Sequence, residues 1–127
     1  MKILIIPSWY PTTRNRNAGI FTRNQAVLLK KYNVETEVLF FDLDIRNIVE
    51  LFPKTSNITS HIDEGVPTYI VKGIFPPKRN LWISKKWAKF CLNIFEQLYK
   101  SKKFPDIIHA HSYFAGAIAL EISNKFI

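Results

Sequence analysis

The sequence predicts an α/β domain in which helices flank a parallel sheet. Two observations lead to this expectation. The chain opens with a short apolar run, which is followed by a polar loop, a glycine and an amphipathic segment, the order of strand, loop and helix. A second apolar run comes next, and a strand–helix–strand unit of this length normally forms a right-handed parallel pair. With 127 residues, 47% of them hydrophobic, the chain can bury a core.

The first half of the chain contains two strands and one helix. We expect a strand at 2–6, because four consecutive apolar residues suit a strand that is covered on both faces. Turn-forming residues fill 8–18, and Gly19 closes this loop before a helix at 20–31. The second strand is expected at 34–41, where apolar and acidic residues alternate before the run becomes wholly apolar.

The middle of the chain is predicted to be a loop and a hairpin. A loop with a helical turn near 45–52 follows the second strand. Two short strands, at 58–63 and 68–72, flank a Glu-Gly-Val-Pro sequence that supplies the glycine and proline of a turn. We therefore expect a hairpin at the edge of the sheet.

The last third of the chain should add a long helix, a strand and another helix. Apolar residues at helical spacing predict a helix at 81–102, and Cys91 within that stripe is interpreted as a small core residue. A strand is expected at 106–111 and a helix at 113–126. The resulting order is that of a Rossmann-like sheet, and the chain stops before the further strands that usually complete one, so we expect a truncated domain.

Charge is concentrated in one segment. Lys78 to Lys103 contains eight basic residues and one acidic residue, a net charge of +7 in a chain whose total is +8. Such an excess suits an anionic partner, and we interpret the segment as a docking face for an anionic membrane surface, with a solvated helix face as the alternative. Nucleic acid is not expected as a partner, because no recognised binding motif accompanies the charge. A single cysteine and the absence of an apolar leader predict a cytoplasmic protein, peripheral to the inner face of the membrane if the basic segment docks there.

The loop before the first helix is one candidate binding site. Ligands of open parallel sheets collect beyond the carboxyl ends of the strands, where helix N-termini present unpaired N–H groups. Gly19 permits close approach of the backbone, and Arg14, Arg16 and Arg23 add positive charge for a phosphate. An ordinary polar loop is the alternative, since neither a G-x-G-x-x-G nor a Walker motif is present.

His109 and His111 form the second candidate site, at the end of the last strand. Their spacing places both imidazoles on one face of the strand, beside the expected ligand edge. A metal site is not expected, because further ligands are missing from the sequence nearby. The histidines are interpreted as hydrogen-bonding or charge-stabilising groups, with a purely structural role as the alternative.

Four segments, in order, resemble the amino-terminal domain of family 4 of the GT-B retaining glycosyltransferases. They are Ile3 to Pro11, Ala18 to Ala26, Glu64 to Tyr69 and Pro105 to His111. The likeness covers nearly the whole chain, and it departs from the family at Ala18-Gly19, where many members carry two glycines.

The resemblance implies a function and a domain arrangement. Family members have two Rossmann-like domains, so residues 1–127 would be a truncated acceptor-side domain and the donor-binding domain would be absent. The whole enzyme would move a sugar from a nucleotide-sugar donor to a glycan or lipid-linked acceptor with retention, in cell-surface polysaccharide synthesis. Gly19 would serve the donor phosphate and His111 would be the catalytic residue, with no cofactor. This chain alone is expected to be inactive, and a non-enzymatic binding module for an anionic partner is the alternative.

Overall fold

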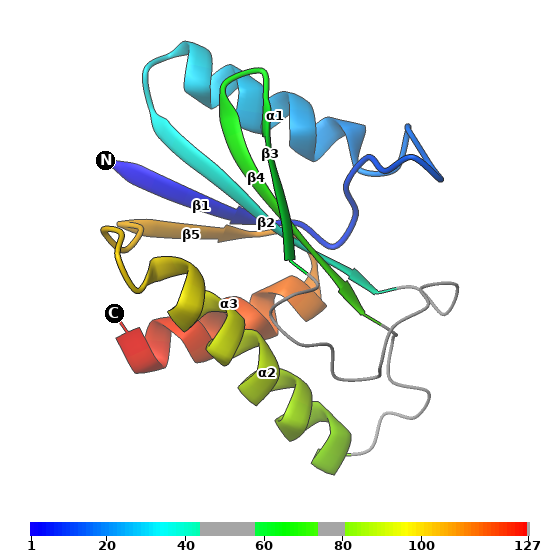
Figure 1. The fold of residues 1–127 in the computed structure, drawn as a ribbon, viewed down its shortest axis with the longest axis vertical. Helices are drawn as coiled ribbons and strands as arrows, with labels where there is room; N and C mark the ends of the chain where they lie inside the picture. Colours follow the sequence, from blue (N-terminus) through cyan, green and yellow to red (C-terminus); the bar gives the residue numbers. More distant parts are fainter. Residues whose placement is uncertain (44–57, 74–80, 127) are drawn as a thin grey trace.

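A five-stranded sheet flanked by three helices makes up the fold (Figure 1). The computed structural model describes residues 1–43, 58–73 and 81–126, and of residues 81–86 it describes the backbone alone. The elements are β1 (Lys2–Ile6), α1 (Ile20–Lys31), β2 (Glu35–Leu43), β3 (Ile58–Asp63), β4 (Val66–Gly73), α2 (Leu81–Tyr99), β5 (Ile107–Ala110) and α3 (Tyr113–Phe126). The predicted α/β class with a Rossmann-like parallel sheet is confirmed.

The strand order within the described residues is β3-β4-β2-β1-β5. β4, β2, β1 and β5 are parallel neighbours, and β3 pairs antiparallel with β4. The chain moves outward from β1 through β2 to β4, and α2 then carries it back to β5 on the other side of β1. β1 and β5 therefore meet where the strand order reverses, which is where ligands bind in sheets of this kind.

The predicted hairpin is present, although its turn is shorter than expected. β4 begins at Val66, two residues before the predicted start, and Pro67 lies inside it opposite Ile62. Glu64 and Gly65 both have positive φ values, 46° and 83°, which is the pattern of a two-residue turn matched to the twist of the strands. The predicted helical turn at 45–52 falls outside the described residues.

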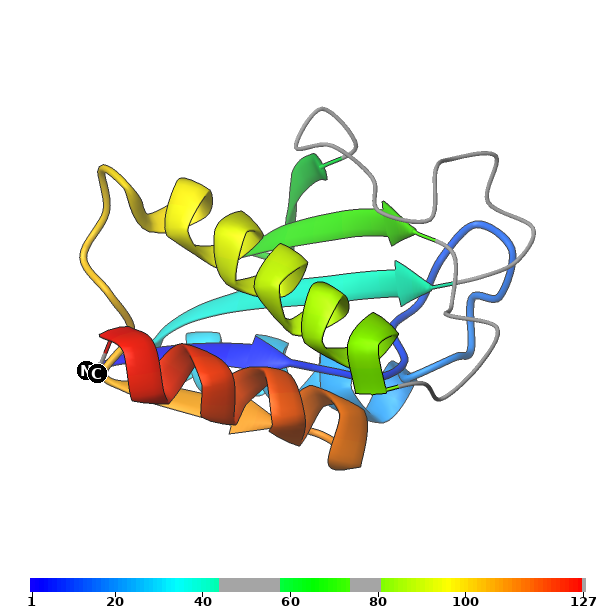
Figure 2. The same cartoon turned by 90° about the horizontal axis from the view of Figure 1, so that it is seen from below.

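Helices cover both faces of the sheet (Figure 2). Successive side chains of β1 point to opposite faces, so they pack alternately against the two helix layers. Ile3 and Ile5 pack in the cluster on the α1 face, with Val27 of that helix. Leu4 and Ile6 pack in the larger cluster on the face of α2 and α3. β1 is thus buried on both sides, as its unbroken apolar run predicts.

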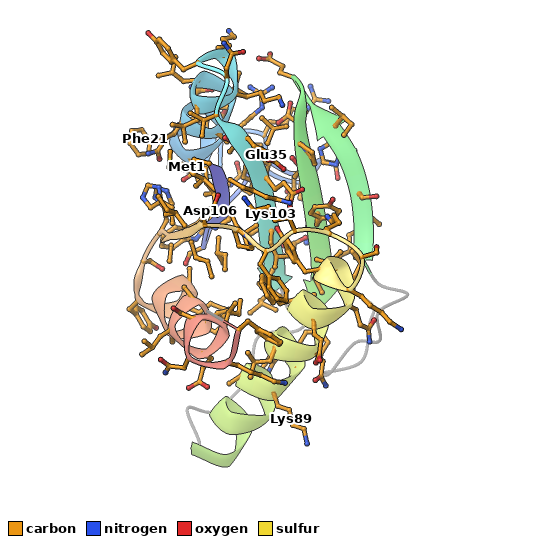
Figure 3. The ribbon with its side chains drawn as sticks, turned by 90° about the vertical axis from the view of Figure 1, so that its left-hand side faces the viewer. Met1, Phe21, Glu35, Lys89, Lys103 and Asp106 are labelled. Carbon is orange, nitrogen blue, oxygen red and sulfur yellow. The ribbon has the colours of Figure 1, made fainter. Side chains whose placement is uncertain are left out.

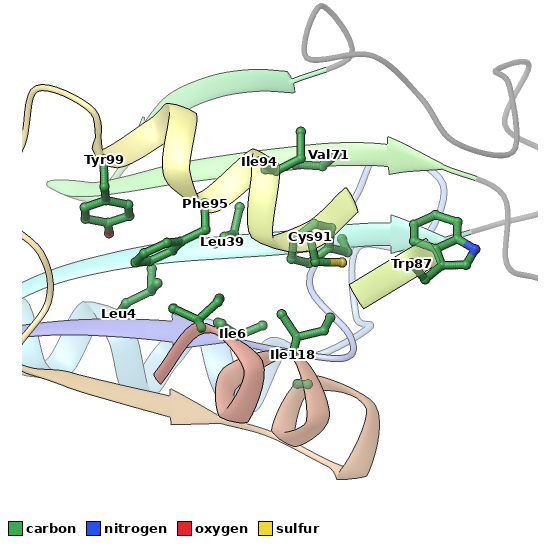
Figure 4. Close-up of a cluster of buried hydrophobic side chains, with 13 residues drawn as sticks. Leu4, Ile6, Leu39, Val71, Trp87, Cys91, Ile94, Phe95, Tyr99 and Ile118 are labelled. Atoms are coloured by element: carbon green, nitrogen blue, oxygen red, sulfur yellow. The ribbon is translucent and has the colours of Figure 1, made fainter. Parts of the chain in front are cut away.

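The larger cluster follows the apolar stripe of α2 (Figure 4). Phe95 is fully buried, and its ring lies 4.6 Å from that of Tyr99 and 5.7 Å from that of Phe104. Cys91 is 1% exposed in the same cluster, and burial raises the pKa of its thiol well above the ordinary value. The predicted core role of Cys91 is confirmed, and its thiol stays protonated at neutral pH.

The exposed side of α2 carries part of the basic segment. Lys89 is exposed and points away from the sheet (Figure 3), and Lys100, directly after the end of α2, is also exposed. Lys78 and Arg79 lie outside the described residues. No described helix is long and apolar enough to cross a membrane. Docking of this face on an anionic membrane surface stays a prediction.

A group of charged and hydroxyl side chains is buried at the amino-terminal end of β1 and β2. Glu37 accepts a hydrogen bond of 2.5 Å from the Tyr99 hydroxyl, and its carboxylate lies 3.2 Å from Lys2 Nζ and 3.7 Å from Lys102 Nζ. Lys2 is 3% exposed and Glu37 is 6% exposed. Burial is the main cause that raises the pKa of Tyr99, so its hydroxyl remains a donor to Glu37. Glu37 interrupts the apolar pattern of β2, and the charge of its carboxylate is balanced by partners that are distant in the sequence.

Replacing Glu37 by glutamine should lower the free energy of unfolding by up to about 3–5 kcal/mol, because buried Lys2 would keep only the exposed Glu35 carboxylate, 3.6 Å from its Nζ, as a counter-charge. Urea denaturation followed by circular dichroism measures this change. Glu96→Gln is the matched control, since Glu96 forms an exposed pair with Lys125 at 3.6 Å and should contribute at most about 1 kcal/mol. Equal effects of the two substitutions would show that the buried group does not stabilise the fold.

Candidate functional site

The candidate site lies at the carboxyl ends of β1 and β5, where the strand order reverses. Hydrogen bonds hold the two following loops together. The His111 N–H donates to the Ile6 carbonyl at 3.0 Å, and Ser8 Oγ donates to the His111 carbonyl at 2.8 Å. Ser8 Oγ also contacts Ser112 Oγ. Ser112 has a φ of 80° and directly precedes α3, so strained backbone borders the site.

A cavity of about 370 Å³ opens between these loops and the start of α1. We call it the switch-point cavity. Its lining residues are Ser8, Trp9, Gly19, Phe21, Thr22, His111 and Ser112. Gly19 and His111, predicted from separate parts of the sequence to meet at one edge of the sheet, therefore line one cavity. Their predicted roles toward phosphate and sugar remain predictions.

Gly19 is needed for the backbone path at the start of α1. It is the N-cap residue, with φ 64° and ψ 21°, a left-handed conformation that L side chains rarely adopt. A Cβ atom added there would lie 2.0 Å from the Trp9 carbonyl oxygen. The sequence predicted that Gly19 would let the backbone come close to a ligand. In the structure, the group that comes close to Gly19 is the backbone carbonyl of Trp9. Without a side chain, Gly19 also leaves the first N–H groups of α1 without a side-chain cap.

The two histidines share one face, as their spacing predicts. The ring centroids of His109 and His111 are 4.5 Å apart. His111 Nε2 is buried and has no hydrogen-bond partner among the described residues. Burial, and to a lesser degree the nearby His109, lower the pKa of His111 below its ordinary value. His111 is therefore a neutral imidazole near pH 7, able to donate or accept a hydrogen bond in the switch-point cavity.

A second cavity, of about 420 Å³, adjoins the first and shares Ser8, Trp9 and Ser112 with it. We call it the aromatic cavity. Its other lining residues are Tyr10, Thr12, Arg14, Asn15, Ala18, Phe40, Phe41, Asp42, Leu43, Tyr113 and Phe114. Sequence reasoning missed Asp42, although its place near the carboxyl end of β2 was a usable signal. It also missed Trp9 and Tyr113, two aromatic residues that follow strands instead of lying within them.

The three arginines proposed for phosphate do not converge. Arg14 lines the aromatic cavity and lies 3.2 Å from Asp42. Arg16 is exposed and lines neither cavity. Arg23 donates two hydrogen bonds to the Asp63 carboxylate, at 2.8 and 2.7 Å. The three arginines differ in their ion pairs with carboxylates that are distant in the sequence. Sequence patterns do not reveal such pairs.

Arg23 joins α1 to the hairpin and to the loop after β1. Asp63 also accepts a hydrogen bond from the Tyr10 hydroxyl at 3.1 Å. The hydrogen bond from Arg23 holds the pKa of Asp63 below its usual range, whereas burial raises the pKa of Tyr10 to about 12. The Asp63 carboxylate is thus ionised and Tyr10 is protonated at neutral pH. The Tyr10–Asp63–Arg23 network fixes the loop that carries Trp9.

Other acidic residues lie away from the cavities or form no metal site. Asp106 is at the opposite end of β5 from His111, where its carboxylate accepts a 2.7 Å hydrogen bond from the Lys2 N–H. Figure 3 shows Asp106 beside Lys103, whose Nζ is 3.3 Å from it. Among the residues whose side chains are described, no group of three or more His, Cys, Asp or Glu could hold a metal ion.

Gly19→Ala should lower the free energy of unfolding by on the order of 2 kcal/mol or more, through left-handed strain and the clash with the Trp9 carbonyl. Chemical denaturation measures it. Gly116→Ala is the control, because a Cβ atom at Gly116 in α3 meets nothing within 4 Å. Alanine there should be neutral or stabilising by up to about 1 kcal/mol. A tolerated alanine at 19 would contradict the close approach.

Asp63→Asn should weaken the dependence of stability on acid. The pKa of Asp63 is lower in the folded state than its usual value near 3.9. The unfolded chain therefore binds the proton more readily, so this carboxylate stabilises the fold above about pH 4, and its contribution falls as pH drops below that value. Thermal melts from about pH 6 to pH 2 should show a shallower decline for Asp63→Asn than for the wild type. Exposed Glu121→Gln is the control and should keep the wild-type slope.

Comparison with known proteins gives a distant relative. The chain is 29% identical over 120 residues to a protein of Bacillus subtilis (strain 168) named "Putative teichuronic acid biosynthesis glycosyltransferase TuaC". The similarity covers 87% of this chain and 30% of the relative, so the chain spans less than a third of that protein's length. No protein-family model matches the chain, and no solved structure gives a significant match. The chain is thus a Rossmann-like α/β protein with a distant resemblance to a glycosyltransferase.

Proposed function

We propose that this chain is the acceptor-side part of a GT-B glycosyltransferase of family 4. The enzyme moves a sugar from a nucleotide-sugar donor to a glycan or lipid-linked acceptor, with retention, in cell-surface polysaccharide synthesis. The observation that carries the proposal is that Gly19 and His111 line one cavity at the switch point of the sheet. The likeness to the teichuronic acid glycosyltransferase supports it independently of that geometry.

The chemistry of sugar transfer fits the groups around the switch-point cavity. Departure of a nucleoside diphosphate leaves negative charge on phosphate oxygen and an electron-poor anomeric carbon. Fixed N–H donors stabilise the first of these charges, and the start of α1 can supply the N–H groups of Phe21 and Thr22, since the Ile20 N–H already donates to the Asn17 carbonyl. A second helix, α3, begins immediately after Ser112 on the other side of the same cavity.

His111 is the candidate catalytic residue. Its neutral imidazole does not repel the electron-poor anomeric centre, as an imidazolium would. Nε2 of His111 has no partner among the described residues and is enclosed in this structure, so a sugar hydroxyl would bind it only after the ring turns toward the cavity, and would then displace no existing bond. The ring of His109 lies beside that of His111 on the same face of β5, with 4.5 Å between the ring centroids.

Sugar transfer tests the proposal directly. The protein expressed from its whole gene is incubated with a panel of nucleoside diphosphate sugars and with glycolipid acceptors extracted from bacterial membranes. Release of nucleoside diphosphate, a product heavier by one sugar, and an anomeric configuration equal to that of the donor are expected. Absence of acceptor-dependent release across the panel would favour a non-enzymatic binding module.

His111→Ala should lower turnover roughly ten- to a thousandfold in that assay, the range for loss of a hydrogen bond made in the transition state. The measurement is kcat at saturating donor. His61→Ala is the matched control, because His61 is exposed on β3. Unchanged kcat in His111→Ala would assign His111 a structural role.

A further inference from the structure

β3 forms one edge of the sheet, and among the described residues no strand lies on its outer side. Residues 59–62 of this strand are exposed, and Ile62 is 68% exposed. An edge strand presents unpaired N–H and C=O groups to other chains, and folded proteins usually prevent such pairing with lysine, proline or a bulge. Residues 58–62 contain no proline, no formal charge and no interruption of their register with β4. β3 is therefore open to pairing with another strand.

The pairing with β4 determines which backbone groups of β3 face outward. In an antiparallel pair, residues that exchange both hydrogen bonds alternate with residues whose N–H and C=O point away from the neighbouring strand. Ile62 lies opposite Pro67, which has no N–H to donate, so these two residues form a pair without hydrogen bonds. By the same alternation, Ser60 and Ile58 belong to such pairs. The backbone groups of Ile58, Ser60 and Ile62 therefore point outward.

The sequence of β3 is nearly symmetric about Ser60. Isoleucine stands two residues away on each side, and Thr59 and His61 are the flanking polar residues. When a second copy of β3 runs antiparallel with Ser60 opposite the partner's Ser60, Ile62 lies opposite the partner's Ile58. All the outward-facing groups of both strands then fall in hydrogen-bonded pairs, and the exposed Ile62 packs beside an isoleucine. A second copy of this chain is thus a strand that fits this edge.

Charges at the two ends of such an interface are complementary. Glu64, in the turn at one end of β3, has a side chain that is 54% exposed and lies 3.5 Å from Arg23. Lys72 is exposed and follows Val71, which lies opposite Ile58 at the other end of β3. The antiparallel arrangement brings Glu64 of one copy and the partner's Lys72 to the same end, about 10 Å apart across two strand spacings. Pairing of residues 58–62 brings no like charges together, although the chain carries a net charge of +8.

We propose that this protein forms a two-fold dimer in which β3 pairs antiparallel with the partner's β3 about Ser60, so that the two sheets become one. This strand pair is much smaller than a standard interface of roughly 20–30 residues a side, so the dimer is weak, with a Kd on the order of 100 µM. β5, whose end borders the switch-point cavity, is the opposite edge of the sheet, and the cavity stays open in the dimer. The inference is independent of the proposed function.

Concentration-dependent association tests the dimer. Sedimentation equilibrium of the protein from about 10 µM to about 1 mM spans the expected Kd. The average mass should rise from that of the monomer, 14.8 kDa, toward twice that value. A monomer throughout this range would overturn the proposal.

Charge exchange at residue 60 tests the two-fold register. Ser60→Lys and Ser60→Glu each place like charges opposite one another across the two-fold axis, and each should weaken association at least about tenfold. An equimolar mixture of the two variants should restore association to the wild-type level or beyond, because opposite charges then meet. Ser123→Lys, the same substitution on exposed α3, is the control and should associate like the wild type. A mixture that stays monomeric contradicts the register.

Proline substitutions distinguish the outer edge of β3 from its inner edge. Ser60→Pro removes an outward N–H and leaves the hydrogen bonds with β4 intact, so it should abolish association while the thermal midpoint stays close to that of the wild type. His61→Pro removes an N–H that bonds to β4 and should lower the midpoint by more than about 5 °C. A dimer that persists in Ser60→Pro would show that another surface associates. Equal loss of stability in the two variants would show that the outward groups are assigned wrongly.

Discussion

β1 is paired with a strand on each of its sides, and this pairing holds both the core and the candidate site together. β1 is parallel to β2 along one edge and to β5 along the other. Its side chains are therefore shared between the two hydrophobic clusters, with Ile5 in one and Ile6 in the other. The same pairing brings Ser8 and His111 together, although 103 residues separate them in the chain. Without β5 against β1, neither cavity would have its second wall.

Opposite ends of the sheet differ in how fully their buried polar groups are paired. Lys2, Glu37 and Tyr99 form the buried polar group at the amino-terminal end, where every charge has a partner. At the carboxyl-terminal end, His111 Nε2 is buried without one among the described residues. A buried polar atom without a hydrogen bond destabilises a fold. It can persist only where other interactions nearby offset its cost. The Tyr10–Asp63–Arg23 network is one of these stabilising interactions, because it ties the loop after β1 to α1 and to the hairpin.

The elements could be predicted from sequence where a local pattern determines them. The apolar run of β1, the stripe of α2 and the period-two spacing of His109 and His111 each need only neighbouring residues to be interpreted. Gly19 was also identifiable, but the reason for it was not, because the clash it avoids is with Trp9, ten residues earlier in a folded-back loop. Arg23 illustrates the limit. Its charge suggested a phosphate ligand, whereas Arg23 donates two hydrogen bonds to Asp63, 40 residues away and brought near by the hairpin, and lies 3.5 Å from Glu64.

The electrostatic character of the site comes from the backbone more than from side-chain charge. Arg14 and Arg23 each face a carboxylate, and the lowered pKa of His111 keeps that ring neutral. What remains at the switch-point cavity is the start of two helices, at Gly19 and after Ser112, whose N–H groups attract anions. These donors are fixed by the fold and need no side chain to be ordered when a ligand arrives. Gly19, whose missing Cβ lets the start of α1 approach the Trp9 carbonyl, therefore matters more to the polarity of the site than any single arginine does.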